Sequence, residues 1–366
     1  MTLKSEIETK SKQIRTDSYP MSIGELSNLY RDKELDVHPE FQRIYRWTEP
    51  QKTRLIESLL LGIPLPPIFV AQRTDGVWDV IDGVQRISTI LQFMGLLRDD
   101  GGEIVDPLVL LSSKYLPSLE GKVWESRDKS RSFSKDEQLF IKRAKIDVNI
   151  VLKESDDDAK YELFMRLNTG GTALSAQEVR NCLLVMSKPE TYKWLRSLSD
   201  MEPFLEAIGL SDRSIEEQYH MELVFRFLIF RTMQAPELTK VGDIGEFLNN
   251  QVSHITSLDS KQRRQEEAVF TETFEYLAKS LGSDGFRRYD CDKEAFTGGF
   301  SVSAYETIAL AIGYHYDGRV QKVQNIMSKV KQLWKNSEFL DNSGSGVRAS
   351  SRIQKVVPLG RKIFKP

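Results

Sequence analysis

The 366-residue sequence has few cysteines and histidines and lacks a long apolar run. Its two cysteines, Cys182 and Cys291, lie far apart, which favours reduced thiols over a disulfide framework. The four histidines are scattered, and neither a zinc-ligand spacing nor a histidine-centred nuclease motif is present. No stretch approaches the roughly 18 to 20 apolar residues of a spanning helix, and the first residues lack a signal-peptide run. We therefore expect a cytoplasmic protein that is not bound to a membrane.

An excess of charge of either sign is lacking as well. The chain has 51 Lys and Arg against 53 Asp and Glu, a formal net charge of -2. Any nucleic-acid contact must therefore come from a local patch. The one clear asymmetry is residues 342–366, which contain no acid but six cations: Arg348, Arg352, Lys355, Arg361, Lys362 and Lys365.

The first half of the sequence alternates helix and strand patterns. An apolar helical face ends at Gly62 and is followed by prolines, which forbid continuation of the helix. Residues 68–72 and 77–81 predict two strands joined in a hairpin, and a helix follows as far as Gly95. Residues 146–152 predict a further strand. This pattern is that of a mixed α/β domain.

The second half is almost wholly helical in pattern. Ser175 and Glu178 match a capping box at a helix start, and residues 220–233 are apolar nearly all round, as in a buried helix. A further helical stripe is formed by Val320, Val323, Met327, Val330 and Trp334. With 40% hydrophobic residues the chain can bury a sizeable core, and its length suits more than one domain. We expect domains over 1–190 and 191–341 and a basic tail over 342–366.

The turn "IDGVQR" between the second strand and its helix has the parts of a nucleotide site. The first N–H groups of a helix are unpaired and lie at the positive end of its dipole, so the position suits phosphate. Gly83 allows close approach to the backbone, and Arg86 offers a fork of donors. Gln85 is suited to orient a water or a base edge, and Asp82 to hold Mg²⁺. The alternative is structural: a capping Asp82, a turn at Gly83 and a solvated Arg86.

Two other stretches bear on this choice. "FQRIYRW" places Gln42, Arg43 and aromatic side chains just before a helix, which offers donors, a cation and stacking rings; its alternative is a loop that seals the core. In "FMRLNTGG", Arg166 and Asn168 precede a Gly-Gly turn, as in a second wall of a phosphate site. The alternative there is a turn followed by a capping box.

Four segments, taken in order, resemble the N-terminal domain of GmrSD-type restriction endonucleases. They are "FQRIYRW", "LIESLLLGIPLPPI", "IDGVQRISTI" and "FMRLNTGGTALSAQEVRN", and the resemblance covers roughly residues 20 to 185. The family has an Asp-Gly-Gln-Gln-Arg turn as its hallmark. The resemblance implies an α+β chain, with a ParB/sulfiredoxin-like nucleotide-binding domain followed by a mostly α-helical C-terminal domain.

The resemblance also implies site residues and ligands. Members of the family are associated with NTP binding and hydrolysis and with defence against phage or foreign DNA. The matched turn gives Asp82, Gln85 and Arg86 as catalytic residues, with Asp82 holding Mg²⁺. The residues implied to bind the nucleotide are Gly83, then Gln42 and Arg43 of the "FQR" segment, and Arg166 and Asn168 of the Arg-x-Asn element.

The sequence departs from the family in two respects. Val84 stands where the family has its first glutamine, and the valine side chain offers no hydrogen bond. We therefore expect weaker NTP hydrolysis, with NTP binding retained. No HNH-like cluster of His and Asn follows residue 190, so we do not expect this chain alone to cut DNA. A separately encoded nuclease or other effector is the implied partner.

Two hypotheses of different classes remain. The first is an NTP-binding, NTP-hydrolysing sensor or regulator of a prokaryotic anti-phage or restriction-type defence system, acting with DNA and an effector. The second is a DNA-binding or scaffold protein with a degenerate nucleotide site. Both assign DNA contacts to tail cations, among them Arg348, Arg352 and Lys355, with an affinity that falls steeply with salt.

Overall fold

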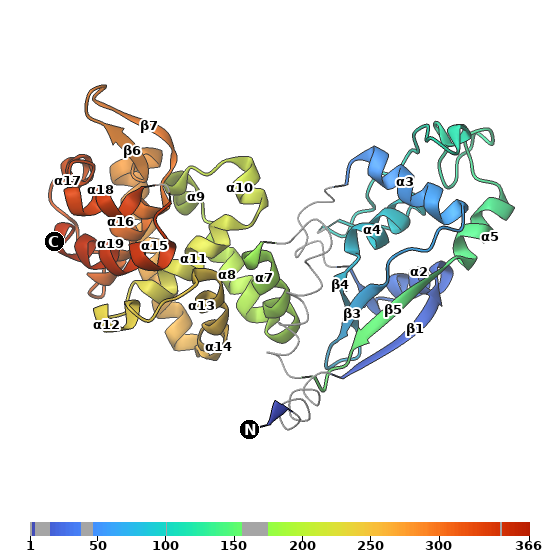
Figure 1. Ribbon diagram of the computed structural model, residues 1–366, viewed down its shortest axis with the longest axis horizontal. Helices are drawn as coiled ribbons and strands as arrows, with labels where there is room; N and C mark the ends of the chain where they lie inside the picture. The colour runs from blue at the N-terminus through green and yellow to red at the C-terminus, as the bar shows by residue number, and fades with distance from the viewer. Residues whose placement is uncertain (1, 4–14, 38–46, 100, 156–174, 345) are drawn as a thin grey trace. The chain divides into compact units, whose positions relative to one another are not determined.

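A computed structural model describes residues 2–3, 15–37, 47–99, 101–155, 175–344 and 346–366 (Figure 1). The contacts divide the chain into two compact units, Met1–Leu174 and Ser175–Pro366. The mixed first unit and mostly helical second unit confirm the α+β class. The division falls after residue 174 rather than after residue 190.

The first unit is built on a five-stranded sheet. Its strands are β1 (Thr16–Ser22), β2 (Leu35–Asp36), β3 (Ile68–Gln72), β4 (Trp78–Asp82) and β5 (Lys145–Val151). Their order is β1-β5-β3-β4-β2, with β1·β5 and β3·β4 antiparallel and β5·β3 and β4·β2 parallel. The predicted hairpin of β3 and β4 and the predicted strand β5 are confirmed.

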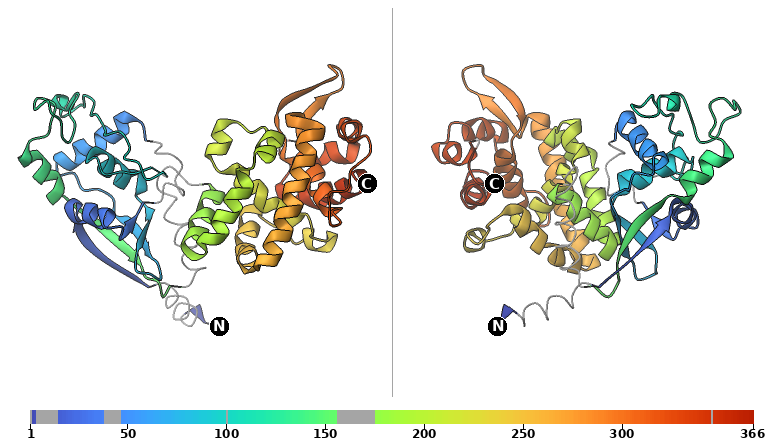
Figure 2. Two further views of the ribbon diagram at one scale, coloured as in Figure 1. Left: turned by 180° about the vertical axis from the view of Figure 1, so that it is seen from behind. Right: turned by 45° about the vertical axis from the view of Figure 1, so that its right-hand side comes forward.

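Within the described residues of this unit, four α-helices accompany the sheet. They are α2 (Ile23–Arg31), α3 (Glu49–Leu60), α4 (Val84–Phe93) and α5 (Lys135–Arg143). Helix α3 packs against α4 and α5, while α2 packs against α5 and β1 (Figure 2). The helix predicted to stop at Gly62 ends at Leu60, and Gly62 has the positive φ that follows many helix ends.

The second unit consists mainly of helices. Those up to the first hairpin strand are α7 (Ala176–Ser187), α8 (Pro189–Ser199), α9 (Glu202–Ile208), α10 (Asp212–Glu216), α11 (Tyr219–Phe230), α12 (Ala235–Leu238), α13 (Ile244–Asn250), α14 (Val252–Ser257) and α15 (Ser260–Leu281). The capping box at Ser175 and the buried helix α11 are as predicted. Among the described residues, no helix is long and apolar enough to cross a membrane.

A hairpin that the sequence pattern did not predict interrupts these helices. Strands β6 (Arg287–Asp290) and β7 (Ala295–Phe300) pair antiparallel and project from the helices of their unit (Figure 1). Helices α16 (Val302–Tyr314), α17 (Ile326–Leu333), α18 (Ser337–Ser343) and α19 (Ala349–Ile363) follow. Cys291, between the strands, is a free and exposed thiol.

Residues 342–366 are part of the second unit rather than a separate tail. Helix α19 packs against α16 and α18. The Arg361 guanidinium donates to the carbonyls of Phe230, Arg231 and Met233, just past the end of α11. A cation at the negative end of a helix is favourable, so this residue ties the last helix to the centre of the unit.

Alternating buried charges link four helices of this unit. Arg180 of α7 donates to Glu222 of α11 at 2.8 Å, and Glu222 also accepts from Arg226 at 2.7 Å. Arg226 donates to Glu306 of α16 at 2.5 Å, and Arg352 of α19 donates to the same carboxylate at 2.7 Å. Burial raises the pKa of Glu222, but the charges of Arg226 and Arg180 outweigh it and hold that pKa below its usual value.

The helical stripe predicted from Val320 begins too early. Helix α17 starts at Ile326, after Asn325 with a φ of 50°. The preceding segment is held outside the helix by α15, because Glu272 accepts the N–H of Val320 and the Tyr276 hydroxyl accepts that of Val323. These side-chain bonds replace the intrahelical bonds that the pattern implied.

Candidate functional site at the start of α4

Strand β4 passes into α4 through a single left-handed residue. Gly83 has φ +94° and forms the N-cap of α4. A Cβ at this position would lie 2.5 Å from Cγ2 of Ile68 on the neighbouring strand β3. Both the conformation and the close packing require glycine here. No side chain among the described residues caps the helix.

Arg86 braces this turn from within the protein. Its guanidinium donates to the carbonyl oxygens of Pro66 and Pro67 and, at 3.0 Å, to Oδ2 of Asp82. The side chain is only 12% exposed. Burial lowers the pKa of Arg86, partly offset by the Asp82 charge, but an arginine remains protonated. The residue is therefore neither solvated, as in the structural alternative, nor fully presented to a ligand.

Asp82 and Gln85 form the open side of the turn. The Asp82 side chain is 39% exposed, and within the described part of the chain only Oδ2 has a hydrogen-bond partner. Gln85 is half-buried, and its Oε1 accepts the backbone N–H of Trp47 at 3.4 Å. Trp47 ends the "FQRIYRW" segment, so the structure brings the end of that segment to the turn. Gln42 and Arg43 themselves lie outside the described residues.

Val84 does not belong to the open side. Its side chain is 4% exposed and is part of the hydrophobic core of the first unit. The residue that departs from the family motif therefore packs inward, and the side chains at the surface of the turn are those of Asp82 and Gln85. The departure replaces a potential hydrogen-bonding group with core packing.

The structure gives less information on the other residues predicted to bind a nucleotide or a metal ion. Arg166 and Asn168 lie outside the described residues. Within the described ranges, no three His, Cys, Asp or Glu side chains gather as metal ligands. Asp82 is thus a single carboxylate in the part that the structure shows. A phosphate-bridged Mg²⁺, which takes one or two protein carboxylates, suits such a position.

The three predicted nucleic-acid contacts do not form one exposed surface. Arg348 and Lys355 are exposed. Arg352 is buried and bonded to Glu306 at 2.7 Å, so it is a structural residue of the second unit. The sequence pattern showed its charge but not its partner, because Glu306 lies 46 positions earlier.

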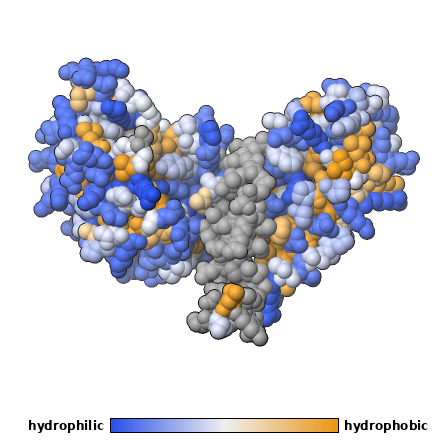
Figure 3. Space-filling view, viewed as in Figure 1, coloured by the Kyte–Doolittle hydropathy of each residue, from blue (hydrophilic) through white to orange (hydrophobic). Residues whose placement is uncertain are grey.

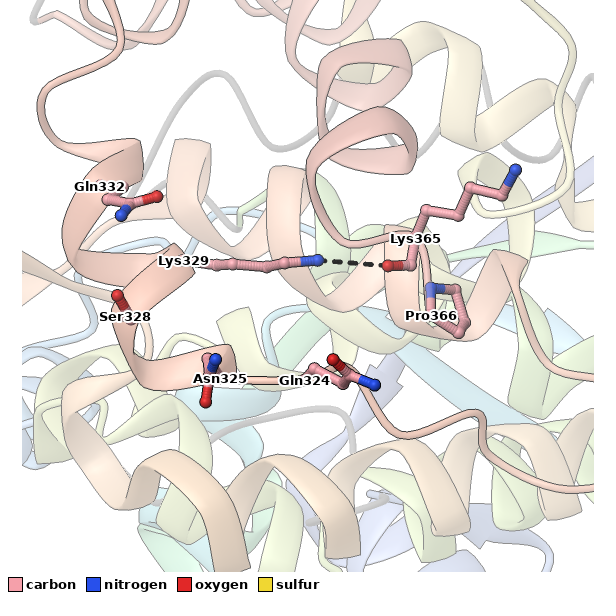
Figure 4. A pocket seen from close by; sticks show the side chains of 7 residues that line it. All are labelled: Gln324, Asn325, Ser328, Lys329, Gln332, Lys365 and Pro366. Atoms are coloured by element: carbon pink, nitrogen blue, oxygen red, sulfur yellow. Dashed lines mark hydrogen bonds between the residues drawn. The ribbon is translucent and has the colours of Figure 1, made fainter.

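Each unit also has a hollow away from the turn. In the first, a hollow of about 530 Å³ between the end of α3 and α5 includes the exposed Ile63, Leu139 and Phe140. Figure 3 shows hydrophobic residues at the surface of this unit, on the right of the picture. In the second, a hollow of about 440 Å³ lies beside α17 (Figure 4). Its lining is Gln324, Asn325, Ser328, Lys329, Gln332, Lys365 and Pro366.

Comparison with known proteins gives a family similarity for the first unit. No curated protein matches the chain. The family model described as "GmrSD restriction endonuclease, N-terminal domain" matches residues 24–185. The match includes the β4–α4 turn and extends beyond the first unit to include most of α7. Residues 24–185, somewhat less than half of the chain, are therefore similar to the GmrSD restriction endonuclease N-terminal domain.

Proposed function

We propose that this chain is a restriction-type defence protein whose N-terminal unit binds and hydrolyses a nucleoside triphosphate at the start of α4. The observation that carries the proposal is the helix start at Gly83, which no described side chain caps, together with the partly exposed Asp82 and Gln85 beside it. Such a helix start favours phosphate through both its free donors and its dipole. Similarity to the family supports a restriction-type role.

The proposed roles follow from how each side chain is held. The Oδ1 atom of Asp82 is the oxygen available to Mg²⁺, which would neutralise phosphate charge. The Gln85 amide nitrogen has no partner among the described residues, so it can donate to a phosphate oxygen or to the attacking water. Arg86 is a positioning residue, because its guanidinium holds Asp82 and the Pro66–Pro67 backbone.

Hydrolysis at this position would be an in-line displacement. The oxygen of water forms a bond to the terminal phosphorus while the bond to the bridging oxygen breaks, and the water proton passes to solvent or phosphate. The products are a nucleoside diphosphate and inorganic phosphate. The helix N–H groups stabilise the charge that spreads over the phosphate oxygens.

Phosphate release from each of the four Mg·NTPs, with and without DNA, tests this proposal. Asp82→Asn and Gln85→Ala should reduce turnover at least about tenfold, as expected when a group that positions water or metal is lost. Asp106→Asn is the matched control, since Asp106 is an exposed acid of the same unit away from the turn. Equal turnover in all four proteins would remove the turn from the mechanism.

The alternative is a DNA-binding or scaffold protein that binds nucleotide without hydrolysis. The inward-facing Val84 favours it, because one glutamine of the family turn contributes no hydrogen bond here. It predicts nucleotide binding without phosphate release. A separately encoded effector would then carry the chemistry on DNA under either proposal.

A further inference from the structure

A basic surface of the second unit lies around α17, outside the family match. Residues 318–337 contain five cations and no acid: Arg319, Lys322, Lys329, Lys331 and Lys335. The chain as a whole has a net charge of -2, so this segment concentrates positive charge. Two further cations, Lys362 and Lys365, follow at the end of α19 and are exposed.

Helix α17 separates its apolar and polar sides clearly. Ile326, Val330 and Leu333 are buried. The side next to these buried residues carries Asn325, Ser328, Lys329 and Gln332, which line the hollow of about 440 Å³. Their spacing of three and four residues places them on one face. Figure 4 shows Lys329 reaching across this hollow, where its Nζ donates to the carbonyl of Lys365 at 3.2 Å.

The cations of this surface are not neutralised by neighbouring acids. Throughout the described ranges, none of the five cations of residues 318–337 forms an ion pair with a carboxylate; Lys331 instead lies 5.0 Å over the Tyr289 ring. The nearby Glu272 is occupied by the Val320 N–H and the Tyr316 hydroxyl, each at 2.9 Å. Asp317, Glu338 and Asp341 flank the segment in sequence and do not line the hollow.

We infer that this surface binds the phosphodiester backbone of a nucleic acid. Lysine, serine, asparagine and glutamine are among the side chains that contact nucleic-acid phosphates and sugars, and all four types line the hollow. No large hydrophobic side chain within residues 318–337 is among those exposed, so the surface lacks the apolar anchors of a membrane-binding helix. The inference does not depend on the nucleotide site, which lies in the other unit.

This surface includes the tail cations Lys362 and Lys365 but not Arg352. Arg352, one of the predicted residues, faces inward to Glu306. The cations around α17 are in part exposed and are presented by a folded helix and the segment before it. Backbone contacts of this kind carry no sequence information, so we expect sequence-independent binding, with dissociation constants of about 10⁻⁴ to 10⁻⁶ M at physiological salt.

Fluorescence anisotropy with the full chain and labelled oligonucleotides, without nucleotide, tests the inference. The surface variant combines Lys322→Glu and Lys335→Glu, both at exposed cations. The control combines Lys193→Glu and Lys240→Glu, also exposed and in the same unit, and it changes the net charge by the same amount. The probes are duplex DNA, single-stranded DNA and RNA of equal length, which show which kind of nucleic acid is bound. Anionic vesicles and heparin test whether the surface binds any polyanion.

We expect the surface variant to bind at least about tenfold more weakly than the wild type, with the slope of log K against log salt reduced by about 2. The control should bind within about twofold of the wild type, since it leaves those contacts in place. Equal losses in the two variants would overturn the inference, as would binding of vesicles or heparin without binding of any nucleic acid. Circular dichroism of both variants checks that the fold is unchanged.

Discussion

Arg86 of the first unit and Arg226 of the second are both largely shielded from solvent, but their hydrogen-bond partners differ. In the first, Arg86 is held by two neutral backbone carbonyls and by Asp82, whose side chain is 39% exposed. In the second, Arg226 lies between the carboxylates of Glu222 and Glu306, and Glu306 is fully buried. The first arrangement leaves a charged group facing solvent beside an open helix start. The second neutralises its charges internally, as a structural network does.

The comparison shows how burial distinguishes the partly exposed α4 turn from the buried ion-pair network. A ligand at the α4 turn would find Asp82 and free N–H groups without dismantling the core. Arg226 could not serve a ligand without leaving a buried carboxylate unpaired, which is costly. Charged residues of the same type thus take their roles from the exposure of their partners.

Breaking the buried network should have the largest effect on stability. In Glu306→Gln, the guanidinium groups of Arg226 and Arg352 lose their shared carboxylate in a buried position. Loss of one partner of a buried ion pair costs about 3 to 5 kcal/mol. Urea denaturation followed by circular dichroism measures this, with the exposed Glu275→Gln as the control. A loss of the same small size in both variants would show that the network contributes little.

The next effect concerns the backbone of the turn. Gly83→Ala adds both a strained positive φ and a Cβ within 2.5 Å of the Ile68 side chain. Strain of this kind costs about 1 to 3 kcal/mol. Gly76→Ala is a matched control, because Gly76 has φ +91° and nothing within 4 Å of its Cβ position. Thermal unfolding should show a larger loss at Gly83, and equal losses would mean that the contact with Ile68 relaxes freely.

Arg86 should show a smaller but specific effect. Arg86→Lys keeps the charge but loses the planar fork that reaches two carbonyls and Asp82. Pro66 and Pro67 are exposed, so water can replace the lost donor, and the expected cost is that of a net hydrogen bond, about 0.5 to 1.5 kcal/mol. The free energy of unfolding measures the change. Unaltered stability would indicate that the guanidinium is dispensable for the turn and free to serve a ligand.

Asp82 should matter least for stability. Its ion pair with Arg86 is partly solvated, and pairs of this kind contribute about 0 to 1 kcal/mol. Asp82→Asn is therefore expected to unfold nearly as the wild type does while losing Mg²⁺-dependent nucleotide binding. Denaturation and binding measured on the same preparation separate the two. A stability loss as large as that of Gly83→Ala would make Asp82 a structural residue.

The sequence predicted the local geometry around the turn well. Two short apolar strands, a glycine and an amphipathic helix are signals within about 25 residues, and β3, β4 and α4 lie where these signals place them. The capping box at Ser175 is equally local and is present. The orientation of Val84 could not be predicted, because it depends on where the strand leaves the sheet.

Partners distant in sequence account for what was missed. Arg86 bonds to carbonyls of Pro66 and Pro67, and backbone acceptors leave no pattern in the sequence. Arg352 looked like a solvated tail cation because its partner Glu306 lies on another helix. The β6–β7 hairpin was missed because its strands are short and carry charged residues and glycines, which are weak strand signals.

The most direct test of the account is the affinity of the full chain for Mg·NTP, measured by isothermal titration calorimetry. Wild type, Gln85→Ala, Asp82→Asn and the control Asp106→Asn are compared after circular dichroism shows them equally folded. The account predicts that the wild type and the control bind alike, whereas the two turn variants bind at least about tenfold more weakly. Equal affinity in all four proteins, or no binding to the wild type, would contradict a nucleotide site at the start of α4.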